Sequence, residues 1–167
     1  MRMVPISLRV EGREVLFVGA GAVAARKAAG FIEGGARVTF VAPRACDAVT
    51  AWVQDGTAQH VERRFNEADL EGAFVVVAAT SDPGTNDTVI RAARARGVLA
   101  CASGRATERG DFELAAVSRD GGLTVAVSSG VPALSVAVAR NVVEELSATA
   151  ERASRSCSLP CRSPFTA

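Results

Sequence analysis

The stretch VLFVGAGAVA, residues 15–24, decides the fold of this chain. Its first four residues are all apolar, which is typical of a strand buried on both faces of a parallel sheet. Gly19-Ala20-Gly21 interrupts the strand, and from Ala24 apolar residues recur through Phe31 and Ile32 at the spacing of one helix face. A strand, a glycine turn and a helix in this order predict the first unit of an α/β domain.

The same alternation extends to about residue 101. Pro43 is expected to stop the second strand, and the alternation of Ile6, Leu8 and Val10 predicts a half-buried edge strand near the start of the chain. Strands that alternate with helices in this way indicate a parallel sheet. The expected strands are residues 38–41, 59–64, 74–79 and 98–101, and the expected helices are residues 45–55 and 86–96.

The pattern changes after residue 102. Residues 103–110 are polar and rich in Gly and Arg, which indicates a loop. Apolar runs on either side of Asp120-Gly121 predict a β-hairpin. Pro132 then begins a helix that is expected to end near Leu146. Residues 148–167 have no clear period, and we interpret them as a flexible tail.

Composition excludes several classes of protein and site. A chain of 167 residues is expected to form one domain, or one domain with a small appendage. Its formal charge of +1 argues against nucleic acid as a partner. His60 is the single histidine, so one chain does not supply a zinc site built from several histidines, and we predict no metal ligands.

The sequence also predicts where the protein resides. No apolar run is long enough to predict a membrane span, and the segment MRMVPISLRV lacks the apolar run of a signal peptide. We therefore expect a cytoplasmic protein with reduced thiols and no membrane partner. The spacing of Cys157 and Cys161 is a weak metal signal, and we interpret that pair as incidental.

The glycine turn carries a functional signal. Gly19-x-Gly21-x-x-Ala24 lies between a strand and a helix, which is the context that a dinucleotide-binding fingerprint requires. The first glycine permits the turn, the second lets backbone approach a pyrophosphate, and Ala24 permits close packing of helix on strand. A tight turn that binds nothing is the other interpretation, and the context favours a nucleotide.

One part of the fingerprint is missing. An acidic residue about 20 positions downstream normally binds the ribose hydroxyls, but the second strand ends Val41-Ala42-Pro43-Arg44. Backbone groups of Pro43 and Arg44 are one replacement. Arg44 as a partner for a 2′-phosphate is a second interpretation, and a solvated loop cation is a third. The cofactor is therefore expected to be NAD, with NADP left open.

Longer matches point to a family. Residues 5–43, PISLRVEGREVLFVGAGAVAARKAAGFIEGGARVTFVAP, closely resemble the start of the N-terminal module of siroheme synthase, the precorrin-2 dehydrogenase/sirohydrochlorin ferrochelatase family. The resemblance extends over about residues 4–147, in the family's order and spacing. The other matching segments are FVVVAATSD at 74–82, Asn86, Gly110-Asp111-Phe112 and LTVAVSSG at 123–130.

The resemblance implies a fold, a reaction and a set of cofactor contacts. It implies a Rossmann-like NAD(P)-binding domain at residues 1–112 and a dimerisation region, a β-hairpin plus a helix, at residues 113–147. Family members oxidise precorrin-2 to sirohydrochlorin by removing a hydride and protons, many then insert ferrous iron, and they form homodimers. The residues that this places at the cofactor are Gly19, Gly21, Ala22, Val23, Ala24, Pro43, Arg44, Ala79 and Thr80.

A cationic segment fits an acidic tetrapyrrole substrate. Residues 91–119 contain six arginines and three acidic residues, and arginine suits bidentate binding of carboxylates. The other interpretation is that these arginines simply cover a helix.

The sequence departs from the family pattern at two positions that the resemblance places near the reacting groups. The family usually has an aspartate after the fifth strand that is proposed as general base, and Arg105 stands at that position here. Arginine does not accept a proton at neutral pH. The loop after Ser128-Ser129-Gly130 is also shorter than in the family, although Ser129 matches a family serine near the tetrapyrrole. Asp111 is the best remaining acid of the region.

We therefore predict an NAD-dependent precorrin-2 dehydrogenase, with Asp111, Ser129 and Arg105 as the candidate catalytic residues. Metal insertion by the same protein stays an open addition. The alternative is a non-catalytic family member that binds a dinucleotide or a tetrapyrrole as a carrier, a sensor or a partner subunit.

Overall fold

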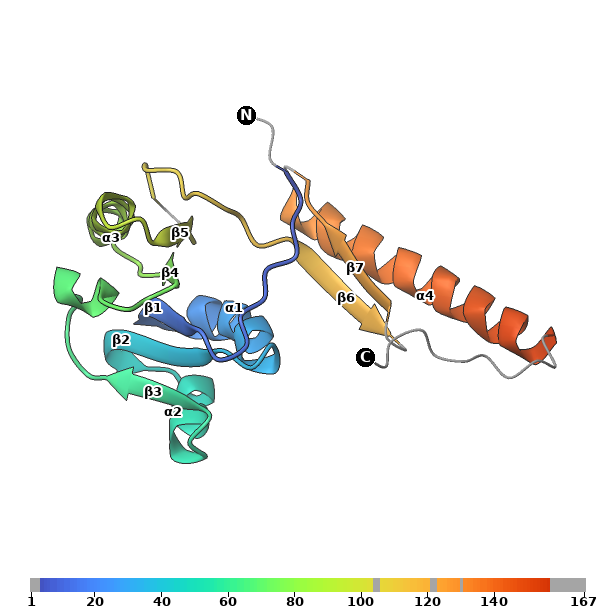
Figure 1. The fold of residues 1–167 in the computed structure, drawn as a ribbon, viewed down its shortest axis with the longest axis horizontal. Helices are drawn as coiled ribbons and strands as arrows, with labels where there is room; N and C mark the ends of the chain where they lie inside the picture. The colour runs from blue at the N-terminus through green and yellow to red at the C-terminus, as the bar shows by residue number, and fades with distance from the viewer. Residues whose placement is uncertain (1–3, 104–105, 121–122, 130, 157–167) are drawn as a thin grey trace. The chain divides into compact units, whose positions relative to one another are not determined.

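The computed structural model describes residues 4–103, 106–120, 123–129 and 131–156. The chain divides into two compact units, residues 1–113 and 114–167. The first unit alternates strands and helices, and the second contains a hairpin and one long helix (Figure 1). The predicted α/β class is confirmed.

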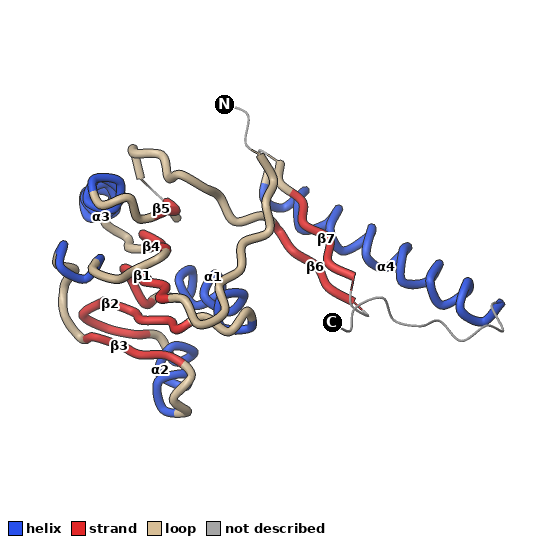
Figure 2. Tube along the Cα trace, viewed as in Figure 1, coloured by secondary structure: helices blue, strands red, loops and turns tan. Residues whose placement is uncertain are grey.

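The first unit is built on five parallel strands in the order β3-β2-β1-β4-β5 (Figure 2). The two central strands, β1 and β4, are almost entirely buried because their apolar runs face helices on both sides. The strands are β1 (Glu14–Ala20), β2 (Arg37–Ala45), β3 (Ala58–Val61), β4 (Val75–Ala78) and β5 (Leu99–Ala102).

Helices cover the two faces of this sheet. Helices α1 (Ala22–Glu33) and α2 (Asp47–Gln54) pack on the face that carries Phe17. Helix α3 (Pro83–Ala95) and the short 3-10 helix η1 (Glu67–Leu70) pack on the face that carries Val18. Successive residues of a strand point to opposite faces, so the run of four apolar residues in β1 supplies both cores.

The connections reverse the direction of winding at the carboxyl ends of two neighbouring strands. Helix α1 leaves the carboxyl end of β1, and α3 leaves the carboxyl end of the neighbouring β4, on the opposite face. In open parallel sheets such a reversal of winding opens a crevice outside the strand ends, and ligands bind there. The glycine turn at residues 19–21 lies at this edge.

The predicted edge strand at Ile6, Leu8 and Val10 is wrong. Residues 4–10 form no strand, and Ile6 is 74% exposed. Within the described residues the sheet ends at β3 and β5, and this segment pairs with neither. Val10 packs against the core on the α1 side, whereas Ile6 and Leu8 are exposed.

Pro43 does not stop the second strand. Strand β2 continues through Pro43 to Ala45, which pairs with Ala20. The register with β1 shifts between Val18 and Ala20, and the pairing with β3 ends at Val41. Pro43 therefore lies at an irregularity where the ladder does not require its missing N–H group.

The second unit contains an antiparallel hairpin, as predicted, and a helix that is longer than predicted. Strands β6 (Ala116–Asp120) and β7 (Leu123–Val127) pair with each other, and α4 (Pro132–Ser156) packs on them. The helix passes its expected end near Leu146 by ten residues and takes in part of the predicted tail. Cys157 and Cys161 lie outside the described residues. No helix in the described part of the chain has the length and apolarity needed to span a bilayer.

Candidate functional site

The glycine turn brings the two central strands into close contact. Gly19 has a φ of +107°, in the region that favours glycine. A Cβ at this position would lie only 2.5 Å from the carbonyl oxygen of Ala79 and 3.1 Å from the backbone nitrogen of Thr80. The Ala79 nitrogen donates to the Val18 carbonyl at 2.8 Å, so the ends of β1 and β4 are held together here. Gly19 is therefore required by the fold itself.

Gly21 has a different environment. It precedes α1 with ordinary extended backbone, φ −84° and ψ 179°, and a Cβ there would meet no atom within 4 Å. No strain and no protein neighbour requires a glycine at this position. The open space beside its Cα fits the close backbone approach that a pyrophosphate needs.

The start of α1 is open to an anion. Among the described residues no side chain caps this helix, and its first turn contains no acidic residue. Helix α3, which starts at the same edge of the sheet, is instead capped by Asp82, whose carboxylate accepts from the nitrogens of Gly84 and Thr85. The Thr85 hydroxyl and backbone hydrogen bonds lower the pKa of Asp82. Free N–H groups at a helix start attract phosphate oxygens. Of these two helices, α1 is the one whose first N–H groups are left without a side-chain cap.

Small residues let α1 pack tightly behind this turn. Ala24 is completely buried and Ala25 nearly so, whereas Val23 is 44% exposed. Ala22 is the first helical residue, and the first bond of the helix runs from the Ala25 nitrogen to the Gly21 carbonyl. The predicted phosphate-binding residues Gly19–Ala24 thus form one continuous segment from the end of β1 into α1.

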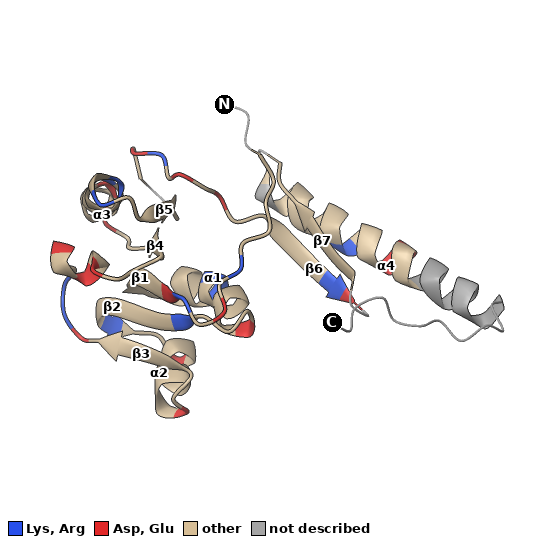
Figure 3. Ribbon diagram, in the orientation of Figure 1, with Lys and Arg blue, Asp and Glu red and all other residues tan. Residues whose placement is uncertain are grey.

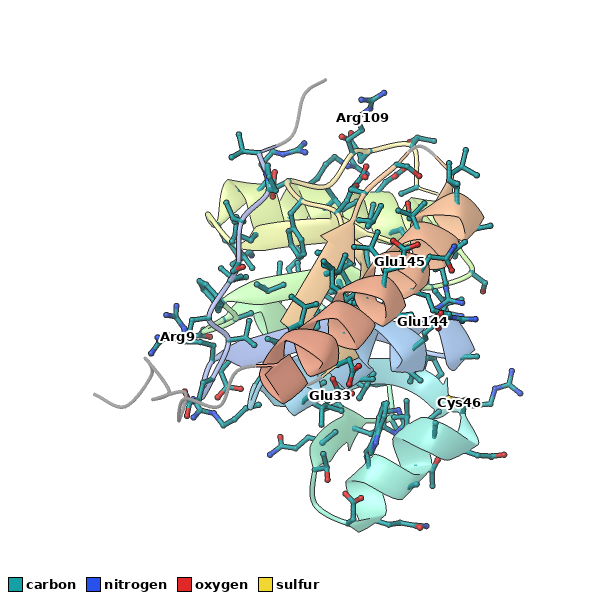
Figure 4. The ribbon with its side chains drawn as sticks, turned by 90° about the vertical axis from the view of Figure 1, so that its right-hand side faces the viewer. Arg9, Glu33, Cys46, Arg109, Glu144 and Glu145 are labelled. Atoms are coloured by element: carbon teal, nitrogen blue, oxygen red, sulfur yellow. The ribbon has the colours of Figure 1, made fainter. Side chains whose placement is uncertain are left out.

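The end of β2 is fixed beside the glycine turn. The Cys46 nitrogen donates to the Ala20 carbonyl at 2.9 Å, and Nε2 of His60 lies 2.8 Å from the Ala42 carbonyl oxygen. Pro43 and Arg44 lie between these two anchored positions, and both are exposed. Figure 4 labels Cys46 at the start of α2, next to this strand end. His60, the single histidine of the chain, has a part-buried ring that is tied to β2 by this contact.

A buried amide shapes the end of β4. Asn86 is fully buried, and its Oδ1 accepts from the nitrogen and the hydroxyl of Thr80 at 3.0 and 2.8 Å. Its Nδ2 donates to the Thr80 carbonyl at 3.1 Å. Because one amide satisfies both backbone groups of Thr80, the segment Ala79–Thr80 keeps a defined position next to Gly19.

One aspartate of α3 holds the loop that follows β5. Oδ1 of Asp87 accepts from the nitrogens of Thr107 and Glu108 at 2.8 and 2.9 Å, and Oδ2 accepts from the Thr107 hydroxyl. The Glu108 backbone bond and the Thr107 hydroxyl bond lower the pKa of Asp87 below its usual value. We call Asp87, Thr107 and Glu108 the Asp87 clamp. No local pattern predicts this clamp, because its partners lie 20 or more positions apart in the chain.

Asp111 closes the same loop against β5. Its Oδ2 accepts from the Ala100 nitrogen at 3.0 Å, and its own nitrogen donates to the Ala100 carbonyl at 2.7 Å. Oδ1 lies 3.7 Å from Nε of Arg94. Gly110 fits only because it lacks a side chain, since a Cβ would lie 2.6 Å from the Ala100 carbonyl oxygen. Asp111 is thus held against β5, with both carboxylate oxygens in contacts.

Several arginines of the predicted cationic segment have structural partners. Figure 3 marks the positions of Lys and Arg on the ribbon in blue. Arg94 donates to the Arg109 carbonyl at 2.7 Å and pairs with Glu108 at 3.5 Å, and Arg96 pairs with Glu67 at 3.0 Å. The Arg109 side chain extends away from the ribbon (Figure 4). Arg94 is still about half exposed, so the segment keeps a positive surface while its arginines hold the loop.

The other predicted catalytic residues are placed separately. Arg105 lies outside the described residues. Ser129 belongs to the second unit, where its hydroxyl lies 2.7 Å from the buried hydroxyl of Ser135 and accepts from the Val131 nitrogen. The described residues contain no group of three or more His, Cys, Asp or Glu side chains that would hold a metal ion.

Comparisons with known proteins identify the family of this chain. The family described as "Putative NAD(P)-binding" matches residues 6–116. Siroheme synthases from Nitrosococcus oceani and Citrobacter koseri are 34% and 36% identical over 130 residues, which cover 78% of this chain. The solved structure of SirC, precorrin-2 dehydrogenase, matches with a TM-score of 0.70 and 28% identity over 88% of this chain and 71% of that one.

These matches confirm the predicted resemblance to the N-terminal module of siroheme synthase. This chain spans only 28% of the length of the two siroheme synthases.

The two glycines of the turn separate a folding role from a binding role. We expect Gly21→Ala to leave the thermal midpoint unchanged or slightly higher, because its Cβ fits and Ala restricts the unfolded chain. The same change should weaken dinucleotide binding at least tenfold in calorimetric titration. Gly19→Ala is the matched control and should lower the midpoint instead. Equal dinucleotide affinity in Gly21→Ala and the parent protein would contradict the assignment.

The Asp87 clamp predicts a pH-dependent contribution to stability. Because the folded-state pKa of Asp87 is lowered, its stabilisation is present above the usual value near 3.8 and is lost as the pH falls through the folded value. Asn resembles the protonated side chain, so Asp87→Asn should lower the urea midpoint at pH 7, and its difference from the parent protein should shrink as the pH falls below 3.8. A difference between the two proteins that is independent of pH would rule out this role.

Proposed function

The chain belongs to this NAD(P)-binding family, and we propose that it is the dehydrogenase that oxidises precorrin-2 to sirohydrochlorin with NAD as hydride acceptor. The observation that carries the proposal is the match to SirC, precorrin-2 dehydrogenase, over 88% of this chain. That span exceeds the first unit, which ends at Glu113, so it takes in more than a generic nucleotide domain.

The residues present fit a nicotinamide dinucleotide. The uncapped start of α1 and the open side of Gly21 suit the pyrophosphate. The exposed end of β2 at Pro43 and Arg44 suits the adenosine, and Ala79-Thr80, held by Asn86, suits the nicotinamide end. The dinucleotide supplies the hydride acceptor, and the protein supplies the position of both reactants.

The proposed reaction removes two hydrogens from precorrin-2. One leaves as a hydride to the nicotinamide, and the other leaves as a proton. General base help is typically worth about 10²–10⁴-fold, and positioning contributes separately. Asp111 is the proposed proton acceptor in the first unit, and its contacts with Ala100 and Arg94 fix its orientation. Ser129 and Arg105 are proposed to contact the acidic substrate.

The competing function is a non-catalytic member of the family that binds a dinucleotide or a tetrapyrrole. Arg105 favours it, because arginine replaces the family's aspartate at that position. The contacts of Asp111 also favour the non-catalytic function, because both of its carboxylate oxygens already contact Ala100 or Arg94. The two functions differ in turnover and not in binding.

We also propose a homodimer through the second unit. Helix α4 buries Ser135, Ala139 and Val143 but exposes apolar residues. Exposed apolar residues on one helix are typical of an interaction surface, and Leu134 and Val138 are one turn apart. The exposed apolar residues of α4 are Leu134 (53%), Val136 (49%), Val138 (37%) and Leu146 (47%).

The proposed compartment is the cytoplasm, and no nucleic acid or membrane partner is proposed. The cysteines Cys46 and Cys101 are free thiols, which supports a reducing compartment. The net charge of +1 gives no support for binding nucleic acid.

Turnover of precorrin-2 tests the proposed activity. Under anaerobic conditions, the purified protein with precorrin-2 and NAD should form NADH and sirohydrochlorin in a one-to-one ratio. The absorbance of each product measures its formation. Arg105→Asp should lower kcat/KM at least tenfold, mainly through KM, because it replaces a carboxylate-binding cation with a repelling charge.

Dinucleotide binding without turnover in the parent protein would exclude the dehydrogenase. A large rise in activity with Arg105→Asp would identify a degenerate site and favour the non-catalytic function. Addition of sirohydrochlorin and ferrous iron to the same protein tests the metal-insertion step separately.

The proposed dimer is tested by light scattering during gel filtration. The parent protein should elute with twice the chain mass of 17.2 kDa. A double change, Leu134→Glu and Val138→Glu, should give a monomer because it places charges on the exposed apolar face of α4. Arg140→Ala, an exposed change on the same helix, is the control and should remain dimeric. A monomeric parent protein would refute the dimer.

A further inference from the structure

Arg109 presents its charge to solvent from the loop that follows β5. The residue is exposed, and its side chain extends away from the ribbon (Figure 4). Within the part of the chain that the structure describes, no ion pair and no side-chain hydrogen bond uses its guanidinium. Arg94 of α3, by contrast, pairs with Glu108 at 3.5 Å. The charge of Arg109 is therefore available to a ligand.

The backbone around Arg109 is held by α3. Oδ1 of Asp87 accepts from the nitrogens of Thr107 and Glu108 at 2.8 and 2.9 Å. Arg94 donates to the Arg109 carbonyl at 2.7 Å. Residues 106–113 contain no helix or strand, so these bonds supply the order that secondary structure supplies elsewhere. A side chain that starts from a fixed backbone loses less freedom when it binds a ligand.

Asp87 serves this loop and not its own helix. Asp82, at the start of the same helix, caps it by accepting from the nitrogens of Gly84 and Thr85. The partners of Asp87 lie 20 and 21 positions away, and the residue is only partly buried. Aspartate is also a weaker helix former than alanine. The helix therefore loses nothing if this side chain is removed, whereas the loop loses its clamp.

A separate anchor holds the other end of the loop. Oδ2 of Asp111 accepts from the Ala100 nitrogen at 3.0 Å, and the Asp111 nitrogen donates to the Ala100 carbonyl at 2.7 Å. Asp87 takes no part in this anchor. Loss of the Asp87 clamp should therefore loosen residues 107–109 and leave Asp111 against β5.

These contacts point to a carboxylate-binding arginine that is positioned by an aspartate. A guanidinium binds carboxylates through paired, charge-assisted hydrogen bonds. Resting on the proposed function, we propose that Arg109 binds a carboxylate of the acidic tetrapyrrole and that Asp87 is its positioning residue. Asp87 itself is negative and by charge alone would repel this substrate. Its proposed effect on substrate binding is therefore opposite in sign to its electrostatic effect.

Steady-state kinetics of the full chain with precorrin-2 and saturating NAD test this inference. Arg109→Gln should raise the KM for precorrin-2 about tenfold and change kcat less than threefold, because the contact is made away from the reacting atoms. Asp87→Ala should raise the same KM at least threefold, although it removes a negative charge. Asp87→Asn keeps an oxygen for the two loop nitrogens, so its KM should rise less than that of Asp87→Ala.

Two further measurements separate positioning from general damage. The Kd for NAD should change less than twofold in each variant. Glu67→Gln is the matched control, because it removes an exposed carboxylate that also contacts α3, through Arg96 at 3.0 Å, and it should change neither KM nor kcat. If Asp87→Ala does not fold, Thr107→Val takes its place, since it removes the hydroxyl donor of the clamp from the loop side.

Each part of the inference has its own contrary result. An unchanged KM in Arg109→Gln would overturn the carboxylate contact. An equal or lower KM in Asp87→Ala would overturn the positioning role, because loss of a repelling charge would then be its whole effect. A parent protein that binds NAD but does not oxidise precorrin-2 would refute the proposed function alone. The Kd for precorrin-2, from anaerobic absorbance titration, then replaces KM in the same comparison of variants.

Discussion

The close contact between the ends of β1 and β4 is the constraint on which the site depends. Gly19 adopts a positive φ and lies against the Ala79 carbonyl, at a distance that leaves no room for a Cβ. This contact lets β1 turn sharply into α1 while β4 continues beside it. The start of α1 and the segment Ala79–Thr80 are thereby brought to the same edge of the sheet, where a dinucleotide needs both.

Side chains of α3 extend this arrangement to the rest of the edge. Asn86 is fully buried and holds Thr80, and Asp87, the next residue, holds the loop after β5. Arg94, two turns further along, contacts Asp111 and the Arg109 carbonyl. A single helix therefore fixes both the nicotinamide end of the proposed site and the loop that carries Asp111. Some of the arginines that would suit an acidic substrate therefore also hold this loop in place.

The sequence predicted those parts of the molecule that local patterns determine. The buried run Val15–Val18 and the glycines after it predicted the central strand and its turn, because period and turn chemistry are local properties. The prediction of an edge strand at residues 6–10 was wrong, because alternation of apolar and polar residues does not reveal whether the segment pairs with another strand. The prediction that Pro43 ends the second strand was wrong for a related reason. Only the register shift between β1 and β2 shows that the ladder does not need an N–H group at this position. The Asp87 clamp joins residues 20 positions apart and has no local signature.

A crystal structure of the protein with NAD would show whether the strand ends around Gly19 bind a nicotinamide dinucleotide. We expect the pyrophosphate at the backbone nitrogens of Ala22 and Val23 and the adenosine along Pro43 and Arg44. We expect the nicotinamide beside Ala79 and Thr80. A dinucleotide bound elsewhere, or a start of α1 that stays free of it at saturating NAD, would show that these residues do not form the nucleotide site.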